Sequence, residues 1–385
     1  MKRIYSIDTM RGIVMIIMAL DHVRDIMHTQ SLAQTPTDLT TTYPALFFTR
    51  WITHLCAPSF VFLSGASAFL VMQRNGSKKD TSKFLFQRGL WLIILEFTLV
   101  NFGLWFDIHF TVLISDVIAA IGFGFIILSL LIRFPPKSVL IAGIAVIFLH
   151  ALVPMFINNS SSAGKGILAF FRPAAFPFDH NRLFIMGYPP VPWLGIMLAG
   201  FGAAPLFLMA DGPRKKILQW TGIAAIALAC LLRFINRYGD SFPWAVQKSR
   251  FFTFLSYINF SKYPPSLDFC LIFLGIMLLL LALLDNVRNS FTEFVSTYGR
   301  VPLFYFVTHW YLIHLLLFIV LFSQGYHWAD FVFGTNFGRP KTGGGIGLWY
   351  VYLAWAGIVI AFYQPCKWFW RYKKNHPELK WLRFI

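Results

Sequence analysis

Long apolar runs alternate with short polar connections along the whole chain, and their lengths predict membrane-spanning helices. Runs of about 20 mainly apolar residues are long enough to cross the hydrocarbon core of a bilayer as a helix. Ten such runs occur: 9–29, 44–72, 87–106, 108–132, 137–157, 191–210, 215–236, 264–285, 298–323 and 346–370. The pattern predicts an all-α, polytopic membrane protein of about ten transmembrane helices, with residues 1–385 forming a single transmembrane domain.

Composition supports this class of protein. Hydrophobic residues make up 57% of the chain and charged residues only 13%, where a soluble protein has about 25% charged residues. The cysteines fall in or beside apolar runs, without the spacing of a disulfide framework or a metal site. We therefore expect them to be small buried apolar side chains.

The basic residues indicate how the helices are oriented. With ten spans, one set of connections, together with both chain ends, carries 20 Lys and Arg residues, and the opposite set carries nine. Because cytoplasmic connections are enriched in Lys and Arg, both termini are predicted to be cytoplasmic. The charges are spread over connections without a nucleic-acid-binding module, so nucleic acid is not an expected partner. A basic inner face fits an anionic cofactor or anionic lipid.

The first run contains several ionisable residues, which points to function. Ionisable groups at membrane depth cost a few kcal/mol each, so they usually face a polar interior. Arg11 and His22 are eleven residues apart, which places them within about 20° of one helix face and about 16 Å apart along the axis. The spacing predicts a cation near one membrane surface and a titratable base near the midplane.

Polar residues recur near the midplane of other predicted spans: Arg50, His54, Glu96, Asp116, Asp268, His309 and His314. Together with His22 of the first span, the three histidines of this set lie at similar predicted depth. The four histidines therefore predict one water-filled central cavity.

Histidine suits general-base catalysis because its ordinary pKa of about 6.5 lies near neutral pH. His22 is the preferred base because of its depth and its spacing from Arg11, and His28, His309 and His314 are the alternatives. Asp25 lies three residues from both His22 and His28, so it can orient either ring. The alternative role for Asp25 is to neutralise charge together with its neighbours in the helix.

A metal site is not expected from these histidines. His309 and His314 are five residues apart, which separates them by about 140° around a helix, and the i, i+4 pair of a zinc helix is missing.

Four segments in this order resemble the heparan-alpha-glucosaminide N-acetyltransferase catalytic-domain family, including its bacterial relatives. They are Ser6-Ile7-Asp8-Thr9-Met10-Arg11-Gly12 with the span that ends at Asp21-His22, Tyr188-Pro189-Pro190-Val191-Pro192-Trp193-Leu194-Gly195-Ile196-Met197, Lys262-Tyr263-Pro264-Pro265-Ser266-Leu267, and Gly299-Arg300-Val301-Pro302-Leu303-Phe304-Tyr305 with Thr308, His309 and His314. The resemblance runs from about residue 3 to residue 320.

The resemblance implies a transmembrane acyltransferase that moves an acetyl group from cytosolic acetyl-CoA to a sugar amine or hydroxyl on the periplasmic or extracellular side. It implies acetyl-CoA as co-substrate, a glycan acceptor, and a place in a cell membrane such as the bacterial inner membrane. Arg11, with Lys2 and Arg88, is expected to contact the anionic part of CoA.

In the animal lysosomal members, the resemblance implies an amide residue at the place of His22 and a working histidine beyond the first helix. The loop 29–42 contains no histidine, so His28 is the nearest equivalent. A proton-coupled small-molecule transporter is the alternative function, because it too needs ionisable groups at the midplane. A membrane partner without turnover, and a homo-oligomer, also remain open.

Overall fold

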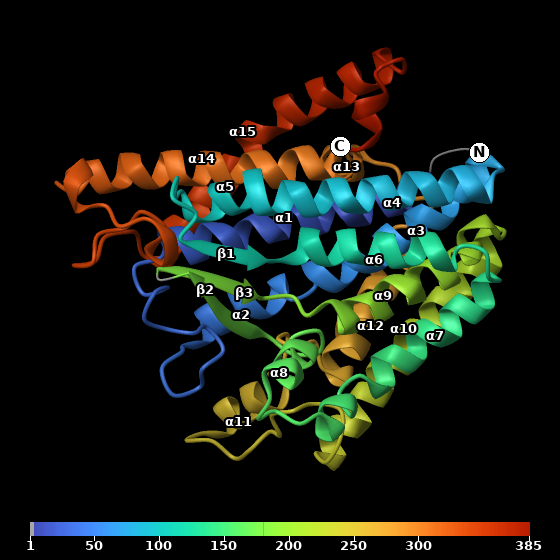
Figure 1. Ribbon diagram of the computed structural model, residues 1–385, viewed down its shortest axis with the longest axis horizontal. Helices are drawn as coiled ribbons and strands as arrows, with labels where there is room; N and C mark the ends of the chain where they lie inside the picture. Colours follow the sequence, from blue (N-terminus) through green and yellow to red (C-terminus); the bar gives the residue numbers. More distant parts are fainter. Residues whose placement is uncertain (1–3, 180) are drawn as a thin grey trace.

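Each of the ten apolar runs contains a helix or a series of consecutive helices in the computed structural model, which describes residues 4–179 and 181–385 (Figure 1). These elements are α1 (Tyr5–Met27), α2 and α3 (Pro44–Thr53, Cys56–Asn75), α4 with a π-helical turn and α5 (Lys78–Leu95, Glu96–Val100, Asn101–Trp105), α6 (Val117–Leu131), α7 (Pro136–Leu149), α9 (Pro190–Ala203), α10 (Asp211–Ile235), α12 (Leu267–Leu283), α14 (Pro302–Ser323) and α15 (Leu348–Asn375).

Six helical segments of the described chain are long and apolar enough to cross a membrane: 44–75, 78–105, 190–208, 211–235, 302–323 and 348–375. The helices α6, α7 and α12 are apolar but shorter. The helix α1 has 23 residues, and its apolar sequence is interrupted by ionisable side chains. The prediction of an all-α, multi-pass membrane protein is confirmed.

The charged helix α1 is also the central helix. It packs against α2, α3, α12, α14, α15 and the amphipathic helix α13 (Ser290–Arg300). Its approach to α13 is very close, since a Cβ atom on Gly12 would lie 1.9 Å from the carbonyl oxygen of Val295. Small residues at such a crossing let two helix backbones touch.

The run 298–323 was expected to be one helix, and the structure divides it. Helix α13 ends at Arg300, and α14 begins at Pro302, whose fixed φ angle suits the first position of a helix.

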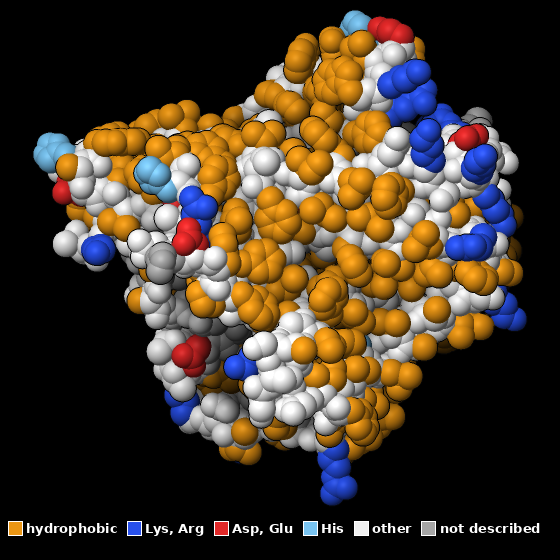
Figure 2. Space-filling model, viewed as in Figure 1, with side chains coloured by type: hydrophobic (Ala, Val, Ile, Leu, Met, Phe, Trp, Pro, Cys, Tyr) orange, Lys and Arg blue, Asp and Glu red, His pale blue; other side chains and the backbone are white. Residues whose placement is uncertain are grey.

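The two ends of the bundle differ in character. Connections 76–77, 132–135, 209–210 and 284–289 lie at one end, which we call the basic end because Lys and Arg side chains gather there, along the right-hand edge of the molecule (Figure 2). The longer connections 28–43, 106–116, 150–179, 181–189, 236–266 and 324–347 lie at the opposite end, which we call the loop end. Successive segments therefore run in alternating directions.

A three-stranded sheet at the loop end was not expected from the sequence. It consists of β1 (Val112–Ser115), β2 (Ala174–Asp179) and β3 (Arg182–Met186) in the order β1-β3-β2. Strand β3 pairs in parallel with β1 and antiparallel with β2.

The predicted helix 108–132 is wrong at its start, because β1 occupies that segment and α6 begins only at Val117. The preceding helix ends at Trp105, and Asp107 beyond it accepts hydrogen bonds from the backbone N–H groups of His109 and Thr111. The amide of Asn101 then pairs with both backbone groups of Ile114 and holds the strand. Side-chain bonds of this kind give the backbone an alternative to the helix.

The predicted helix 137–157 is also shorter in the structure and ends at Leu149. The remaining short helices are α8 (Ser162–Leu168), α11 (Arg250–Tyr257) and 3₁₀ turns at Val153–Phe156, Ala204–Leu208, Trp328–Asp330, Gly334–Asn336 and Lys380–Arg383.

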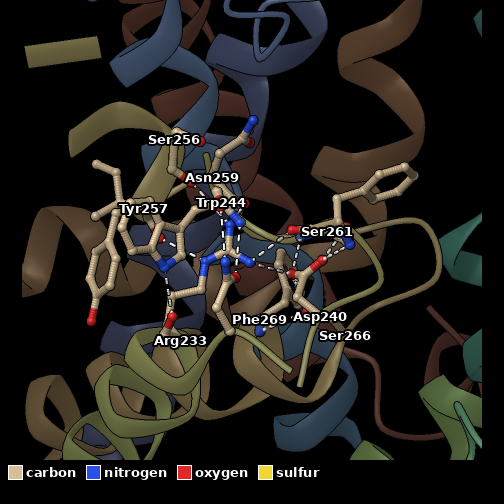
Figure 3. Close-up of polar contacts among 12 residues, drawn as sticks. Arg233, Asp240, Trp244, Ser256, Tyr257, Asn259, Ser261, Ser266 and Phe269 are labelled. Carbon is tan, nitrogen blue, oxygen red and sulfur yellow. Dashed lines mark hydrogen bonds and ion pairs between the residues drawn. The ribbon is translucent and has the colours of Figure 1, made fainter. Parts of the chain in front are cut away.

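The connection 236–266 packs over the loop end around one buried arginine, Arg233 at the end of α10 (Figure 3). Its guanidinium donates hydrogen bonds of 2.9–3.0 Å to four carbonyl oxygens, those of Phe242, Ser256, Tyr257 and Asn259. Asp240 lies 3.9 Å from the same guanidinium and accepts hydrogen bonds from Ser261 and Ser266. Arg233 therefore fixes this connection in one arrangement.

Candidate active site

His22 on α1 and His309 on α14 meet where these two helices pack together. His22 Nδ1 lies 2.6 Å from His309 Nε2, which is a short hydrogen bond. The ring of His22 stacks on Trp310, with centroids 3.9 Å apart and an interplanar angle of 16°. His309 is completely buried, whereas His22 is partly exposed. The two imidazoles form a dyad with one accessible member.

The hydrogen bonds of the dyad determine its neutral tautomers. His309 Nδ1 lies 3.0 Å from the carbonyl oxygen of Tyr305, which can only accept, so His309 Nδ1 carries a proton. The Nε2 atom of neutral His309 is then an acceptor, and His22 Nδ1 donates to it. The remaining nitrogen, His22 Nε2, keeps its lone pair. The geometry thus leaves His22 as the member of the pair that can accept a proton.

Asp25 lies on the same helix but contacts Arg24. Its carboxylate accepts a hydrogen bond of 2.7 Å from Arg24 Nη2, and Asp21 accepts one of 2.8 Å from the same nitrogen. Arg50 of α2 also bonds to Asp21. In the described part of the chain, the ring of His22 is therefore held by His309, and Asp25 belongs to a neutralised group of four charges.

His28 lies at the C-terminal end of α1. Its main-chain oxygen accepts hydrogen bonds from Arg339 Nη1 at 2.5 Å and from Ser31 Oγ at 2.9 Å. The bond from Arg339 attaches the connection 324–347 to the end of α1. The structure does not bring His28 into the dyad.

The four histidines that were expected in one cavity have different surroundings in the structure. His54 is buried against Phe269 and Phe273, and His314 stacks on Phe106 with centroids 4.7 Å apart. The rotation of about 140° between residues five apart turns His314 away from the dyad. Among the described residues, no group of three His, Cys, Asp or Glu side chains is placed to hold a metal ion.

A cavity of about 510 Å³, the loop-end cavity, opens between the connections 31–37 and 259–263. Arg24, Asp25, Arg50 and His54 line its floor, and Phe242, Phe260 and Tyr263 are aromatic residues in its wall. Its charged side chains include Lys262, which the sequence singled out only as part of a family-like segment. The Lys262 ammonium is 5.0 Å from the ring of Tyr263 and 5.6 Å from that of Tyr188.

A larger cavity of about 950 Å³, the basic-end cavity, opens at the other end of the bundle. Arg11 and Arg88, two of the residues expected to contact CoA, line it. The guanidinium of Arg11 is held by Ser67 Oγ at 2.8 Å, the Gly299 carbonyl oxygen at 3.3 Å and Asp8 at 3.5 Å. Lys2 lies outside the described residues.

A pocket of about 80 Å³, which we call the apolar passage, adjoins the basic-end cavity and shares Arg11, Ser64, Arg88, Phe125 and Pro302 with it. Its other lining residues are nearly all apolar, and they include Phe306 of α14. The ring of Phe306 lies 6.3 Å from His22 and 5.9 Å from His309, centroid to centroid. Arg11 thus lines both the basic-end cavity and the apolar passage, and Phe306 lines the passage beside the dyad.

The comparison with protein families agrees with the resemblance seen in the sequence. Residues 3–239 match the family model described as heparan-alpha-glucosaminide N-acetyltransferase, catalytic. The segments 262–267 and 299–314 lie beyond this match. A comparison with curated proteins found no match. Since the matched residues cover more than half of the chain and include Arg11 and His22, the chain belongs to the heparan-alpha-glucosaminide N-acetyltransferase catalytic-domain family.

Proposed function

We propose that this protein transfers an acetyl group from acetyl-CoA, bound at the basic end, to an amine or hydroxyl group of a sugar bound at the loop end. The observation that carries the proposal is the position of the dyad. The His22 ring lies 6.3 Å from Phe306, which lines the apolar passage, and Arg24 and Asp25, two and three residues further along the same helix, line the loop-end cavity. The hydrogen bonds of the dyad leave the Nε2 atom of His22 as a proton acceptor.

The proposal includes a topology. All ten helical segments cross the membrane, with the basic end and both termini in the cytoplasm, as in a bacterial inner membrane. The excess of Lys and Arg at that end supports this orientation. The three shorter helices α6, α7 and α12 connect the same two ends as their longer neighbours.

The basic-end cavity suits the charged part of acetyl-CoA. Phosphates form charge-assisted hydrogen bonds with Arg and Lys, and Arg11 and Arg88 stand where the cavity narrows. Lys2 belongs to the same proposed set. The uncharged pantetheine arm then enters the apolar passage, and the thioester comes to rest near Phe306 and His22.

The loop-end cavity suits a sugar. Exposed aromatic faces such as those of Phe242 and Tyr263 stack on apolar sugar faces, and the neighbouring amide and hydroxyl groups of Gln34, Thr35 and Asn259 can hydrogen-bond with sugar hydroxyls. Asp25, at the edge of this cavity, lies one helical turn beyond His22 and is a candidate contact for the acceptor.

The chemistry follows from the free nitrogen. His22 Nε2 takes the proton of the acceptor amine or hydroxyl as that group attacks the thioester carbonyl carbon, and His309 holds the opposite side of the ring. The new N–C or O–C bond forms, the C–S bond breaks, and the proton passes from His22 to the departing sulfur. Two substrates fixed at one point need no acetylated enzyme intermediate. The membership of an acetyltransferase family favours this reaction over proton-coupled transport.

The direct test is a transfer assay with the purified protein in lipid nanodiscs. We expect acetyl-CoA to bind saturably at micromolar concentration. We also expect free CoA thiol and acetylated sugar to appear in equal amounts when amino-sugar or neutral-sugar oligosaccharides are supplied. The His22→Ala variant is the matched control and should bind acetyl-CoA without releasing thiol. Absence of saturable acetyl-CoA binding would contradict the proposal and favour the transporter.

A further inference from the structure

The end of α15 is followed by a segment that returns to the bundle, and we call residues 376–385 the return segment (Figure 1). Leu382 is buried, and the ring of Phe384 lies 5.6 Å from that of Phe84 on α4. Arg88 donates a hydrogen bond of 3.3 Å to the carbonyl oxygen of Arg383. The return segment is thus attached to the helix that carries one of the expected CoA contacts.

This attachment closes one side of the basic-end cavity. Pro377, Arg383 and Ile385 of the return segment line it, together with Lys373 and Lys374 of α15. Lys373 also donates a hydrogen bond to the main-chain oxygen of Ile385, which fixes the last residue of the return segment to α15. The cavity therefore has one wall from α3 and α4 and another from α15 and the return segment.

Positive charge stands on both walls. Arg11, Arg74 and Arg88 come from α1, α3 and α4, and Arg300, Lys373, Lys374 and Arg383 come from the part of the chain beyond the family match. Asp80 is the one acidic residue in the described lining.

This arrangement fits a ligand with several separate phosphate groups better than one with a single anionic group. A single phosphate is satisfied by two or three neighbouring cations, whereas these seven surround a cavity of about 950 Å³. The volume is in the range of pockets that hold whole cofactors. Phe84 and Trp370 also line the cavity and offer flat aromatic faces to a nucleobase.

We infer that the return segment and the end of α15 form the second wall of a nucleotide-phosphate site, in which Lys373, Lys374 and Arg383 bind the phosphates of the acyl donor. The inference rests on the proposed function and adds a specificity to it. These residues make the protein select a donor that carries a phosphorylated nucleotide, and they take no part in the proton transfer at His22.

The experiment compares three donors that share one thioester: acetyl-CoA, acetyl-dephospho-CoA and acetyl-pantetheine. We expect Lys374→Ala and Arg383→Ala each to raise KM for acetyl-CoA about tenfold, since each removes a charge-assisted contact. The kcat at saturating acetyl-CoA should be unchanged. The KM for acetyl-pantetheine should change less than twofold, because that donor has no nucleotide. Lys215→Ala, an exposed residue of α10 that does not line the cavity, is the matched control.

Several outcomes would overturn the inference. One is an unchanged KM for acetyl-CoA in both variants, and another is an equal loss with acetyl-CoA and acetyl-pantetheine, which would assign the segment to folding. Lys374→Glu provides a second measure, because charge reversal should raise KM for acetyl-CoA more than Lys374→Ala does. If the unaltered protein transfers no acetyl group, the proposed function fails by itself. Calorimetric binding of CoA then tests the inference, with tenfold weaker binding in the variants supporting it and equal or absent binding overturning it.

Discussion

The imidazoles of His22 and His309 share a hydrogen bond of 2.6 Å between residues 287 positions apart in the chain. His309 is in turn anchored to the carbonyl oxygen of Tyr305, one turn earlier on α14. A backbone oxygen at the end of this series sets the direction of every proton in it. The result resembles the arrangement in which a second group orients a catalytic histidine and selects its tautomer.

Removal of the His22 imidazole, whose Nε2 atom is the proposed proton acceptor, should abolish acetyl transfer without unfolding the protein. We expect His22→Ala to lower the rate of acetyl transfer roughly 10²–10⁴-fold, the usual contribution of a general base. Acetyl-CoA binding and thermal stability should remain near those of the unaltered protein. His28→Ala is the matched control on the same helix. If His22→Ala retained more than about a tenth of the activity and His28→Ala abolished it, the base would be His28.

His309 should act through His22. We expect His309→Ala to lower kcat about tenfold or more. Without the hydrogen bond from His22 Nδ1, neither the orientation of the His22 ring nor its tautomer is fixed. In His309→Gln the side-chain oxygen can accept from His22 Nδ1, so part of kcat should return. The pH dependence of kcat distinguishes positioning from packing, because only a change at the dyad shifts the profile. Equal kcat and an equal profile in all three proteins would rule out the positioning role.

Arg11 should contribute to donor binding. A charge-assisted hydrogen bond is worth about 1.5–3 kcal/mol, so we expect Arg11→Ala to weaken acetyl-CoA binding about tenfold or more in a calorimetric titration. Arg11→Lys keeps the positive charge, so its affinity for acetyl-CoA should lie between that of Arg11→Ala and that of the unaltered protein. Because Arg11 also bonds to Ser67 and Gly299, thermal unfolding is measured alongside. Unchanged affinity together with lower stability would give Arg11 a structural role only.

Phe306 should limit the length of the acyl group. Its ring lines the apolar passage beside the dyad, where the proposed function places the acyl group. One methylene in an apolar pocket is worth about 1–3 kcal/mol, so we expect Phe306→Ala to raise the use of butyryl-CoA relative to acetyl-CoA by about tenfold or more. The ratio of kcat/KM values measures this. A ratio that stays constant would place the acyl group elsewhere.

The two ends of the bundle should face opposite sides of the membrane. Lys79 near the start of α4 and Thr335 in the connection 324–347 are both exposed. Cys230 is exposed, contrary to the expectation that the cysteines are buried, so it is first replaced by serine. A single cysteine introduced at position 79 and one introduced at position 335 should then react with a membrane-impermeant maleimide from opposite sides of the membrane. Labelling of both positions from the same side would show the topology to be wrong.

Local sequence was enough to identify the membrane class and the helical segments. An apolar run of membrane length must satisfy its backbone hydrogen bonds internally. Such a run therefore forms a helix whatever the packing of the rest of the chain. The start of α6 at Val117, the end of α7 at Leu149 and the division of the run 298–323 at Arg300 were missed. Polar side chains and a proline set these boundaries through local backbone contacts, which the apolar content of a segment does not reveal.

Part of the candidate site could be predicted from the sequence, and part could not. Its residues on α1 could be found from sequence, because a charged or titratable side chain in an apolar helix costs energy unless it has a role, and Arg11 and His22 share one face. Their partners could not be ranked. Asp25 was expected to orient the ring of His22 or His28, and His309 and His314 were alternative bases. Only distances across helix interfaces show that His309 is the residue that contacts His22.

Sequence by itself determined that this is an all-α membrane protein of an acetyltransferase family with Arg11 and His22 on its first helix, because length, hydropathy and short-range spacing are properties of one segment. Only the tertiary structure decided that His309 rather than Asp25 holds the ring of His22, and that residues 376–385 close the basic-end cavity. These are contacts between segments far apart in the chain. They depend on how whole helices pack, and no local pattern encodes that.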